Sequence, residues 1–277
     1  MNNEIKKFAV IGHPISHSLS PQIHYLFAKG LGIDLEYKKI DITEDDFIVN
    51  IEHLKNEGYF GLNITLPLKN AAYEICDELS ERSSLSKSVN TMTFTENKII
   101  GDSTDGRGLV NDLLNKGINI KGKNIFLVGA GGAANGAIYD LIQGKPKYIF
   151  LTNRTFATAI KMKDYWNSFA EKNQVILEVV DFSNKFNFDL IINATSSSLT
   201  SKDSPLPSSS FNFLNNKGIC YDMMYGSKTP FMKEAYKQTN SVYDGLGMLV
   251  EQAAESFKIW HQLHPTTKKV EELLRKL

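Results

Sequence analysis

Polar side chains that could bind and activate a small substrate recur at the ends of apolar runs in the first 105 residues of the chain. Ser18 and Ser20 lie at the start of a predicted helix, where hydroxyls and free backbone N–H groups could bind a carboxylate. Lys69 falls in the first turn of another predicted helix, where the helix dipole disfavours a cation. This position suits a lysine that transfers protons better than one that only adds solubility. Asp105 could hold that ammonium and accept from a substrate hydroxyl. A helix cap, a solvated lysine and a turn aspartate are the simpler alternatives for Ser20, Lys69 and Asp105.

A glycine-rich turn predicts a nucleotide site further along the chain. The run 124–128 is short and mostly apolar, as in a buried parallel strand. Five residues follow it and open a predicted helix: Gly129, Ala130, Gly131, Gly132 and Ala133. Glycines let the backbone bend tightly and approach a pyrophosphate, whose charge the helix N-terminus stabilises. An ordinary loop is the alternative, but the flanking strand and helix match the dinucleotide fingerprint.

The residues after the next predicted strand, 148–152, indicate which nucleotide binds. An NAD site usually places Asp or Glu at this strand end, where it accepts from the ribose 2′-hydroxyl. Here Asn153, Arg154 and Thr155 stand instead. Arg154 can bind a 2′-phosphate through planar, charge-assisted hydrogen bonds, whereas a carboxylate would repel that phosphate. The sequence therefore predicts NADP as the cofactor, with an ordinary surface position for Arg154 as the alternative.

Composition limits the remaining function classes. The chain has 277 residues, enough for one large or two ordinary domains. Its 31 basic and 31 acidic side chains argue against a binder of nucleic acid or membrane surfaces. No apolar run suits a membrane span or a signal peptide, and Cys76 and Cys220 lie far apart in apolar stretches, which predicts a cytoplasmic protein with reduced thiols. No metal is expected, because Pro14 disfavours a helix that would align His13 and His17.

Predicted strands and helices alternate along the chain and place the polar clusters at strand ends. Further strands are predicted at 7–11, 35–40, 61–65, 175–180, 189–193, 218–222 and 241–243, with a hairpin at 89–100. Helices are predicted after Ser20, Thr43 and Pro67, and at 106–115, 248–263 and 266–277. The serine-rich stretch 196–210 is predicted to be a loop.

This alternation predicts an α/β fold with two domains. Residues 1–106 would form an N-terminal α/β substrate-binding and catalytic domain. Residues 107–240 would form a Rossmann-type, doubly wound NADP-binding domain. The C-terminal helices, within 241–277, have no strand partner left in the second domain, so they are predicted to return to the first.

The chain resembles the shikimate dehydrogenase family from end to end. The matching motifs are GHPISHSLSPQIH, GLNITLPLK, SVNT, GDSTDGRG, GAGGAA, NRT, NATSSSL, YDMMYG, TPF and DGLGMLVEQAAESFKIW. Their order and spacing together are far more specific than a lone glycine turn. The resemblance implies reversible, NADPH-dependent reduction of 3-dehydroshikimate to shikimate in aromatic amino acid (chorismate) biosynthesis, by a monomer or homodimer.

The resemblance also implies a role for each matching residue. Lys69 and Asp105 would be the catalytic pair, with Lys69 supplying the proton to the ketone oxygen directly or by relay. The substrate would contact Ser18, Ser20, Thr65, Lys69, Asn90, Asp105, Tyr225 and Gln252. The cofactor would contact the turn 129–133, Asn153, Arg154, Thr155, Thr195, Met223, Gly245 and Glu81. For Glu81 and Gln252, a solvated helix surface is the simpler alternative.

Two departures from the common family pattern keep other functions open. Ser103 replaces the asparagine usual before Thr-Asp-Gly, which would alter how Asp105 is held. Thr158 stands where many members carry a second base, which would weaken discrimination against NAD. Thr158 leaves open a quinate/shikimate dehydrogenase with relaxed cofactor use. Because fold does not fix function, a non-catalytic dinucleotide sensor on the same fold is the second alternative. Retention of both Lys69 and Asp105 argues against the sensor.

Overall fold

The computed structural model describes residues 5–182, 186–196 and 203–276, and it divides into two compact units. Unit 1 contains Met1–Gly108 together with Leu249–Leu277, and unit 2 contains Leu109–Met248. The C-terminal segment thus belongs with the N-terminal one. Unit 2 extends past the predicted limit at residue 240, because the strand β12 (Val242–Tyr243) pairs with the second sheet.

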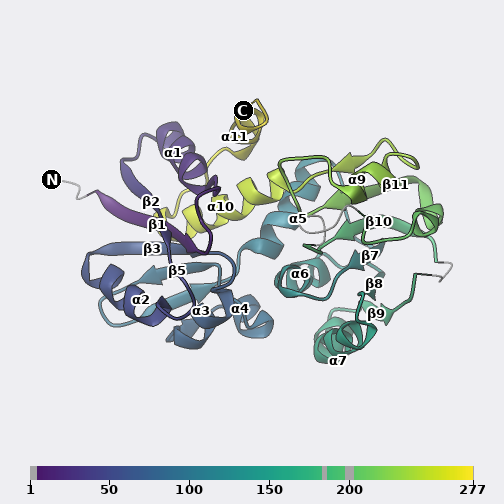
Figure 1. Cartoon of the computed structure of the whole chain (residues 1–277), viewed down its shortest axis with the longest axis horizontal. Helices are drawn as coiled ribbons and strands as arrows, with labels where there is room; N and C mark the ends of the chain where they lie inside the picture. Colours follow the sequence, from purple (N-terminus) through teal and green to yellow (C-terminus); the bar gives the residue numbers. More distant parts are fainter. Residues whose placement is uncertain (1–4, 183–185, 197–202, 277) are drawn as a thin grey trace. The chain divides into compact units, whose positions relative to one another are not determined.

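Unit 1 is built on a mixed, six-stranded sheet (Figure 1). Its strands lie in the order β2 (Leu35–Asp41), β1 (Lys6–Gly12), β3 (Tyr59–Ile64), β5 (Thr91–Phe94), β6 (Ile99–Asp102) and β4 (Glu78–Leu79). β1 is parallel to β2 and β3, whereas β5 runs antiparallel to both β3 and β6. The carboxyl ends of β1, β3 and β6 therefore meet the start of β5 at one edge, so residues far apart in sequence can share a site there.

Helices of unit 1 pack against this sheet or, in the case of the last one along the chain, against the first helix. They are α1 (Ser20–Leu31), α2 (Phe47–Asn56), α3 (Lys69–Ile75), α4 (Glu81–Ser86), α11 (Thr267–Leu274), the start of α5 (Asp105–Asn115) and most of α10 (Leu246–His261). α10 packs tightly against β3, where Gly61 leaves room for the Trp260 indole, which donates to the Met92 carbonyl at 3.1 Å. A Cβ atom on Gly61 would lie 2.4 Å from Nε1 of Trp260. This close packing fixes the polar residues of α10 relative to the sheet.

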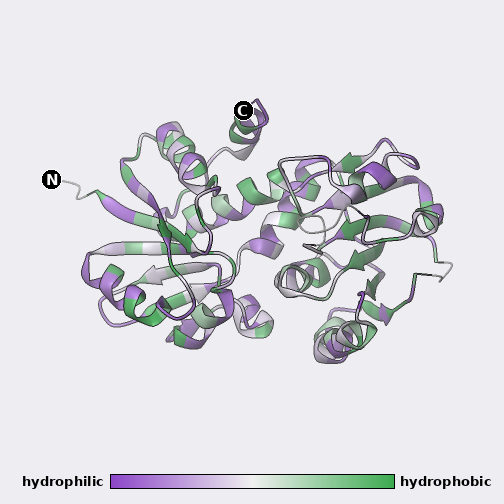
Figure 2. Cartoon of the chain, viewed as in Figure 1, coloured by the Kyte–Doolittle hydropathy of each residue, from purple (hydrophilic) through white to green (hydrophobic). Residues whose placement is uncertain are grey.

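Unit 2 contains a six-stranded, wholly parallel sheet. The order is β12, β11 (Leu214–Asp222), β10 (Phe188–Asn193), β7 (Asn124–Val128), β8 (Tyr148–Thr152) and β9 (Ile176–Val179). This is the doubly wound Rossmann order, in which the chain starts at a central strand, β7, and builds outward to both sides. Figure 2 shows the hydrophobic stretches along its central strands, as expected for a parallel sheet covered on both faces. The other elements are α6 (Gly132–Gln143), α7 (Phe156–Lys172), α9 (Pro230–Ala235) and a 3₁₀ helix at Ser208–Phe213.

Several predicted element boundaries were wrong for local reasons. The helix expected to be capped by Thr43 begins only at Phe47, because the intervening acidic residues form a turn in which the Thr43 hydroxyl donates to Asp46 at 2.9 Å. The predicted serine-rich loop is also only partly correct. Residues 208–210 belong to the 3₁₀ helix, and residues 197–202 lie outside the described part of the chain. α4 and the two-residue strand β4 were not predicted, since both are shorter than any clear periodic pattern.

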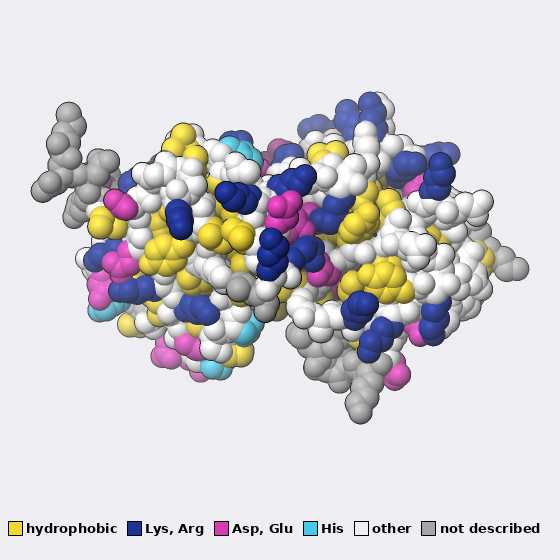
Figure 3. Space-filling model, turned by 90° about the horizontal axis from the view of Figure 1, so that it is seen from above, with side chains coloured by type: hydrophobic (Ala, Val, Ile, Leu, Met, Phe, Trp, Pro, Cys, Tyr) yellow, Lys and Arg dark blue, Asp and Glu magenta, His cyan; other side chains and the backbone are white. Residues whose placement is uncertain are grey.

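The described residues contain no helix that is long and apolar enough to cross a membrane. Figure 3 shows one face of the molecule, on which basic, acidic and hydrophobic side chains are interspersed. This mixed pattern agrees with the balanced net charge of the sequence.

Candidate functional site

Lys69 and Asp105 form an ion pair at the edge of the unit 1 sheet where β1, β3 and β6 end. Lys69 is the first residue of α3 and Asp105 the first residue of α5. The Lys69 Nζ donates to Oδ2 of Asp105 at 2.5 Å, and the two side chains are 22% and 14% exposed. The carboxylate is favoured at the helix N-terminus, whereas the ammonium opposes its own helix dipole and depends on Asp105 for compensation. The pair is thus shielded but still reachable by a small molecule.

Asn90 holds the second oxygen of Asp105. It immediately precedes β5 and is 2% exposed. Its Nδ2 donates to Oδ1 of Asp105 at 2.9 Å, and its Oδ1 accepts from the Thr104 N–H at 2.8 Å. Because a backbone N–H can only donate, the Thr104 contact sets which end of the amide faces Asp105. Both carboxylate oxygens of Asp105 therefore have a fixed partner, and the carboxylate is preorganised.

Gln252 joins this group from α10, within unit 1. Its Oε1 accepts from Nδ2 of Asn90 at 3.3 Å, and its Nε2 donates to the Leu249 carbonyl at 2.8 Å. The alternative of a solvated glutamine does not hold, because the side chain is part of the same polar cluster. Lys69, Asn90, Asp105 and Gln252 are thus brought together by direct contacts.

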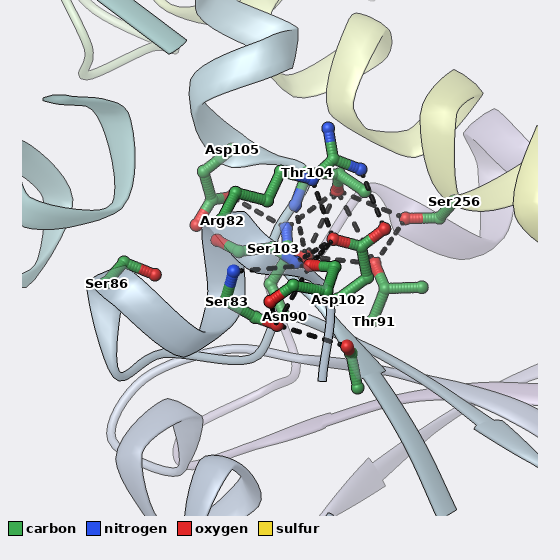
Figure 4. Close-up of polar contacts among 12 residues, drawn as sticks. Arg82, Ser83, Ser86, Asn90, Thr91, Asp102, Ser103, Thr104, Asp105 and Ser256 are labelled. Atoms are coloured by element: carbon green, nitrogen blue, oxygen red, sulfur yellow. Dashed lines mark hydrogen bonds and ion pairs between the residues drawn. The ribbon is translucent and has the colours of Figure 1, made fainter. Parts of the chain in front are cut away.

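A buried hydroxyl and amide network lies behind Asn90, and sequence reasoning did not assign it a role. Ser256, one helical turn after Gln252, contacts Thr91 Oγ1 at 2.7 Å and accepts from Asn63 Nδ2 at 2.9 Å. Thr91 in turn donates to Oδ1 of Asn90 at 2.9 Å (Figure 4). Asn63 also accepts from the Tyr37 hydroxyl at 2.6 Å. Ser256 lies four residues after Gln252, on a helix face that is otherwise apolar. This spacing was the sequence signal that could have identified Ser256 as part of the site.

Ser18 and Ser20 contact each other at the N-terminus of α1. The Ser18 hydroxyl donates to Oγ of Ser20 at 3.2 Å and accepts from the Ser20 N–H at 3.3 Å. Ser20 is not the helix cap that the simpler alternative proposed; it is the first helical residue, and the cap is Leu19, which makes no side-chain cap bond. The Ser18 side chain takes over this role, because it satisfies one free N–H of the first turn.

Thr65 directly follows β3 and is half-buried beside the end of β1. Its backbone N–H donates to the Ile11 carbonyl at 2.9 Å, and its own carbonyl accepts from the Leu68 N–H at 3.0 Å. Gly12 leaves space for the Thr65 methyl group, which would lie 2.4 Å from a Cβ atom at that position. The close approach of β1 and β3 thus brings Thr65 to the same sheet edge as Asn90.

In unit 2, the glycine-rich turn opens α6 as predicted. Gly129 has φ +108°, and a Cβ atom there would meet Thr195 Cγ2 at 3.0 Å. Gly131 and Gly132 are exposed, and nothing lies within 4 Å of where their Cβ atoms would be. The turn therefore presents bare backbone at the N-terminus of a 12-residue helix, where a pyrophosphate fits both sterically and electrostatically.

The end of β8 is tied to this turn. Oδ1 of Asn153 accepts from the Ala130 N–H at 3.2 Å, and its Nδ2 donates to the Thr155 carbonyl at 3.0 Å. Arg154 lies between these anchored residues and is exposed. An exposed guanidinium next to the residue that contacts the glycine turn fits a 2′-phosphate better than a 2′-hydroxyl. These residues suit NADP.

Thr195, Met223 and Gly245 lie at the ends of neighbouring strands in unit 2. The Thr195 hydroxyl donates to Oδ1 of Asn193 at 2.8 Å. The Met223 N–H donates to the backbone carbonyl of Asn193 at 3.0 Å. A Cβ atom on Gly245 would lie 2.1 Å from the Met223 carbonyl oxygen, so only glycine fits. The strand order of the sheet therefore brings these residues together, although they are far apart in the chain.

The last two predicted contact residues are Tyr225 and Glu81. Tyr225 is a half-buried residue of unit 2 in the segment after β11, and burial raises the pKa of its phenol. Glu81 lies exposed in the first turn of α4 in unit 1. Within the described residues, no group of His, Cys, Asp and Glu could hold a metal ion.

Three family models match successive parts of the chain. The shikimate dehydrogenase substrate binding domain matches residues 10–92, the shikimate / quinate 5-dehydrogenase model residues 109–202, and the shikimate 5'-dehydrogenase C-terminal domain residues 245–275. Together they span both units.

Individual proteins match over nearly the whole chain. The shikimate dehydrogenase (NADP(+)) of Vesicomyosocius okutanii is 42% identical over 98% of this chain and 99% of its own length. The enzyme of the same name from Methylobacillus flagellatus is 43% identical over 97% and 98%. Among solved structures, shikimate 5-dehydrogenase from Thermus thermophilus, in complex with NADP(H) and shikimate, has a TM-score of 0.87 at 30% identity over 98% of this chain and 99% of that one.

Proposed function

The chain belongs to the shikimate dehydrogenase family, and from that membership we propose that it catalyses the reversible, NADP-dependent interconversion of 3-dehydroshikimate and shikimate. The observation that carries the proposal is the pairing of Lys69 with Asp105, supported by Asn90 and Gln252. Such a group can exchange a proton with a ring hydroxyl and hold its neighbours in place. A dinucleotide sensor would have no use for this pair.

The chemistry assigned to the chain's own residues is proton transfer at one oxygen. In the reductive direction, the Lys69 ammonium gives its proton to the ketone oxygen as a C–H bond forms at the carbon. In the oxidative direction, the Lys69 amine takes the hydroxyl proton. Asp105 orients the lysine and accepts from a neighbouring hydroxyl, while Asn90 fixes the carboxylate. Positioned proton transfer of this kind contributes about 10²–10⁴-fold in rate.

The substrate contacts follow from the family match and from the position of each residue. We assign the substrate carboxylate to the paired hydroxyls of Ser18 and Ser20, which lie at a helix N-terminus. The ring hydroxyls are assigned to five side chains: Thr65, Asn90, Asp105, Gln252 and Tyr225. The Thermus thermophilus relative was solved with shikimate and NADP(H), which supports a small-molecule substrate of this kind.

NADP is the cofactor we assign to unit 2. The glycine turn would hold the pyrophosphate, Arg154 the 2′-phosphate, and Thr195, Met223 and Gly245 the nicotinamide end. Glu81 is assigned to the cofactor from the family match alone. When bound, the reduced cofactor supplies the hydride that the ketone carbon receives. The relatives from Vesicomyosocius okutanii and Methylobacillus flagellatus are both named as NADP(+) enzymes, which supports NADP rather than NAD as the cofactor.

We also propose a cytoplasmic enzyme that acts as a monomer or homodimer. The support for the cytoplasmic location is that Cys76 and Cys220 are free thiols, and burial raises the pKa of each to about 12. Such thiols stay protonated and unreactive at neutral pH. Size-exclusion chromatography with light scattering measures the assembly; a tetramer would contradict it.

Steady-state kinetics in a two-by-two grid test the proposed function: shikimate or quinate, each with NADP⁺ or NAD⁺, followed by nicotinamide absorbance. The expected result is a high kcat/KM only for shikimate with NADP⁺. Comparable turnover of quinate or with NAD⁺ would instead indicate a quinate/shikimate dehydrogenase. Folded protein that binds NADPH but turns over none of the four combinations would contradict an enzymatic function.

A further inference from the structure

Arg82 and Asp102 form an ion pair, and Asp102 lies three positions before the proposed catalytic aspartate, Asp105. We infer that this pair is a positioning device that fixes the segment 102–105 and, through it, the geometry of the Lys69–Asp105 pair. The inference rests on the function proposed above and adds a residue, Arg82, whose side chain has no role in that proposal. Arg82 contributes neither a proton nor a substrate contact in this account.

The contact between the two side chains is bidentate. Nε of Arg82 donates to Oδ1 of Asp102 at 2.7 Å, and Nη2 donates to Oδ2 at 2.8 Å. The side chains are 14% and 20% exposed. Two parallel charge-assisted hydrogen bonds fix the relative orientation of the guanidinium and the carboxylate as well as their distance. α4, which carries Arg82, is thereby locked to the last residue of β6.

The remaining hydrogen bonds of Asp102 connect this contact to the chain that follows. Oδ1 of Asp102 also accepts from the Ser80 hydroxyl at 2.5 Å and from the Ser103 N–H at 2.7 Å. The Asp102 carbonyl accepts from the Asn90 N–H at 3.0 Å. The carboxylate thus organises the turn between β6 and α5, three residues ahead of Asp105 (Figure 4).

The ion pair matters because it anchors the first residue of the segment, Asp102. The buried Ser103 hydroxyl has no hydrogen-bond partner among the described residues, so it does not hold the turn. Thr104 is held by Asn90, and Asp105 by Asn90 and Lys69. These contacts fix the end of the segment, whereas Arg82 fixes its beginning from a different helix. A shift at Asp102 would displace Asp105 relative to Lys69.

The charge state of Asp102 supports a permanent ion pair. Burial alone would raise the pKa of this carboxyl, but Arg82, the Ser80 hydroxyl and the Ser103 N–H together hold the pKa below its usual value. Asp102 therefore stays ionised at neutral pH, throughout the range in which the enzyme would be assayed. Removing Arg82 would leave a largely buried carboxylate without its counter-ion.

The test measures kcat and KM for three variants in the direction of shikimate oxidation. Arg82→Met keeps the apolar stem, Arg82→Lys keeps the charge without the planar fork, and Asp102→Asn removes the acceptor charge. We expect kcat to fall about 10- to 100-fold for Arg82→Met and Asp102→Asn, because displacement by about 1 Å is enough for such a loss. KM for shikimate and NADP⁺ should stay within about threefold, and Arg82→Lys should fall between wild type and Arg82→Met.

Lys98→Met is the matched control. Lys98 pairs with Glu78 near the same edge strands, but both side chains are 52% exposed and neither contacts the segment 102–105. This variant should keep wild-type kcat. A merely structural ion pair would lower the melting temperature of the Arg82 and Asp102 variants and leave kcat unchanged well below that temperature. That result would overturn the inference.

Hydrogen exchange separates this inference from the proposed function. Amides 103–106 should exchange faster in Arg82→Lys and Asp102→Asn than in wild type, and they should be unchanged in Lys98→Met. Unchanged exchange in all three variants would overturn the positioning role even if the wild type is an active dehydrogenase. A wild type without shikimate oxidation would contradict the proposed function, while the exchange data would still decide whether Arg82 fixes the segment.

Discussion

Nζ of Lys69 and Oδ2 of Asp105 lie 2.5 Å apart, although 36 positions separate the two residues in the chain. Each is the first residue of its helix, and the two helices start from the same edge of a mixed sheet. The β3–β5–β6 arrangement creates this proximity, because two successive antiparallel pairings return the chain to the edge where β3 ends. The contact thus depends on topology as much as on the two side chains.

Arg154→Ala tests the cofactor assignment. The variant should raise KM for NADP⁺ by about 10- to 150-fold, because one charge-assisted hydrogen bond to phosphate contributes about 1.5–3 kcal/mol. KM for NAD⁺ should change little, since that cofactor has no 2′-phosphate. Steady-state kinetics with both cofactors check this. An equal effect on the two would show that Arg154 does not contact the 2′-phosphate.

Ser256→Ala tests the buried network behind Asn90. Ser256 is fully buried and its hydroxyl contacts Asn63 and Thr91, so its loss should lower the free energy of unfolding by about 1–3 kcal/mol. Thr91→Ser keeps the hydroxyl and should retain the network, whereas Thr91→Val removes it. Urea denaturation measures all three. Ser256→Ala as stable as wild type would mean that the network adds nothing to folding.

Ser103→Ala and Thr104→Val form a contrasting pair at adjacent buried positions. The Ser103 hydroxyl has no partner among the described residues, so its removal should leave stability unchanged or slightly raised. The Thr104 hydroxyl contacts Nδ2 and Oδ1 of Asn90 at 2.9 and 3.1 Å, so Thr104→Val should lower the melting temperature. Differential scanning calorimetry compares the two. A clear loss in Ser103→Ala would contradict the structure at this position.

His24 should make unit 1 sensitive to acid. Its ring is fully buried and stacks on Tyr37 with centroids 4.3 Å apart. Burial, reinforced by the charge of His261, lowers the pKa of His24 from 6.5 to about 3. Between these values the unfolded chain binds a proton that the folded chain does not, so stability falls as pH falls, by at most about 1.4 kcal/mol per pH unit.

Replacing the histidine should remove this dependence. His24→Phe keeps an aromatic ring. Between about pH 6 and 4, the slope of unfolding free energy against pH should fall by up to about 1.4 kcal/mol per pH unit, which corresponds to one proton. Denaturant titrations across that range measure the slope. His53→Phe is the control, because His53 is an exposed residue of α2. An unchanged slope in His24→Phe would show that this histidine is protonated in the folded protein.

Local signals predicted most of the fold, but not the contacts that assemble the site. The strands 124–128 and 148–152 were located to the residue, because buried parallel strands are continuous apolar runs with glycine or polar residues at their ends. Helix starts were less predictable. Thr43 looked like a cap, yet the chain makes a turn before α2 begins at Phe47.

Partners distant in sequence could not be predicted from one chain. Ser256 and Asn63 are 193 positions apart, and nothing in either local sequence indicates the other. Arg82 lies in a six-residue helix too short to show a periodic pattern, and its pairing with Asp102 depends on how α4 meets β6. The candidate residues Lys69 and Asp105 were found by their helix-start positions and by the family resemblance, whereas the groups that hold them needed the structure.

The most direct test of the account is the kcat of Lys69→Ala for shikimate oxidation with NADP⁺, measured beside wild type and Lys98→Ala. The account predicts a kcat about 10²–10⁴-fold below wild type, with KM for shikimate changed far less and Lys98→Ala unaffected. A folded Lys69→Ala protein with near-normal kcat would contradict the assignment of Lys69 as the group that transfers the proton.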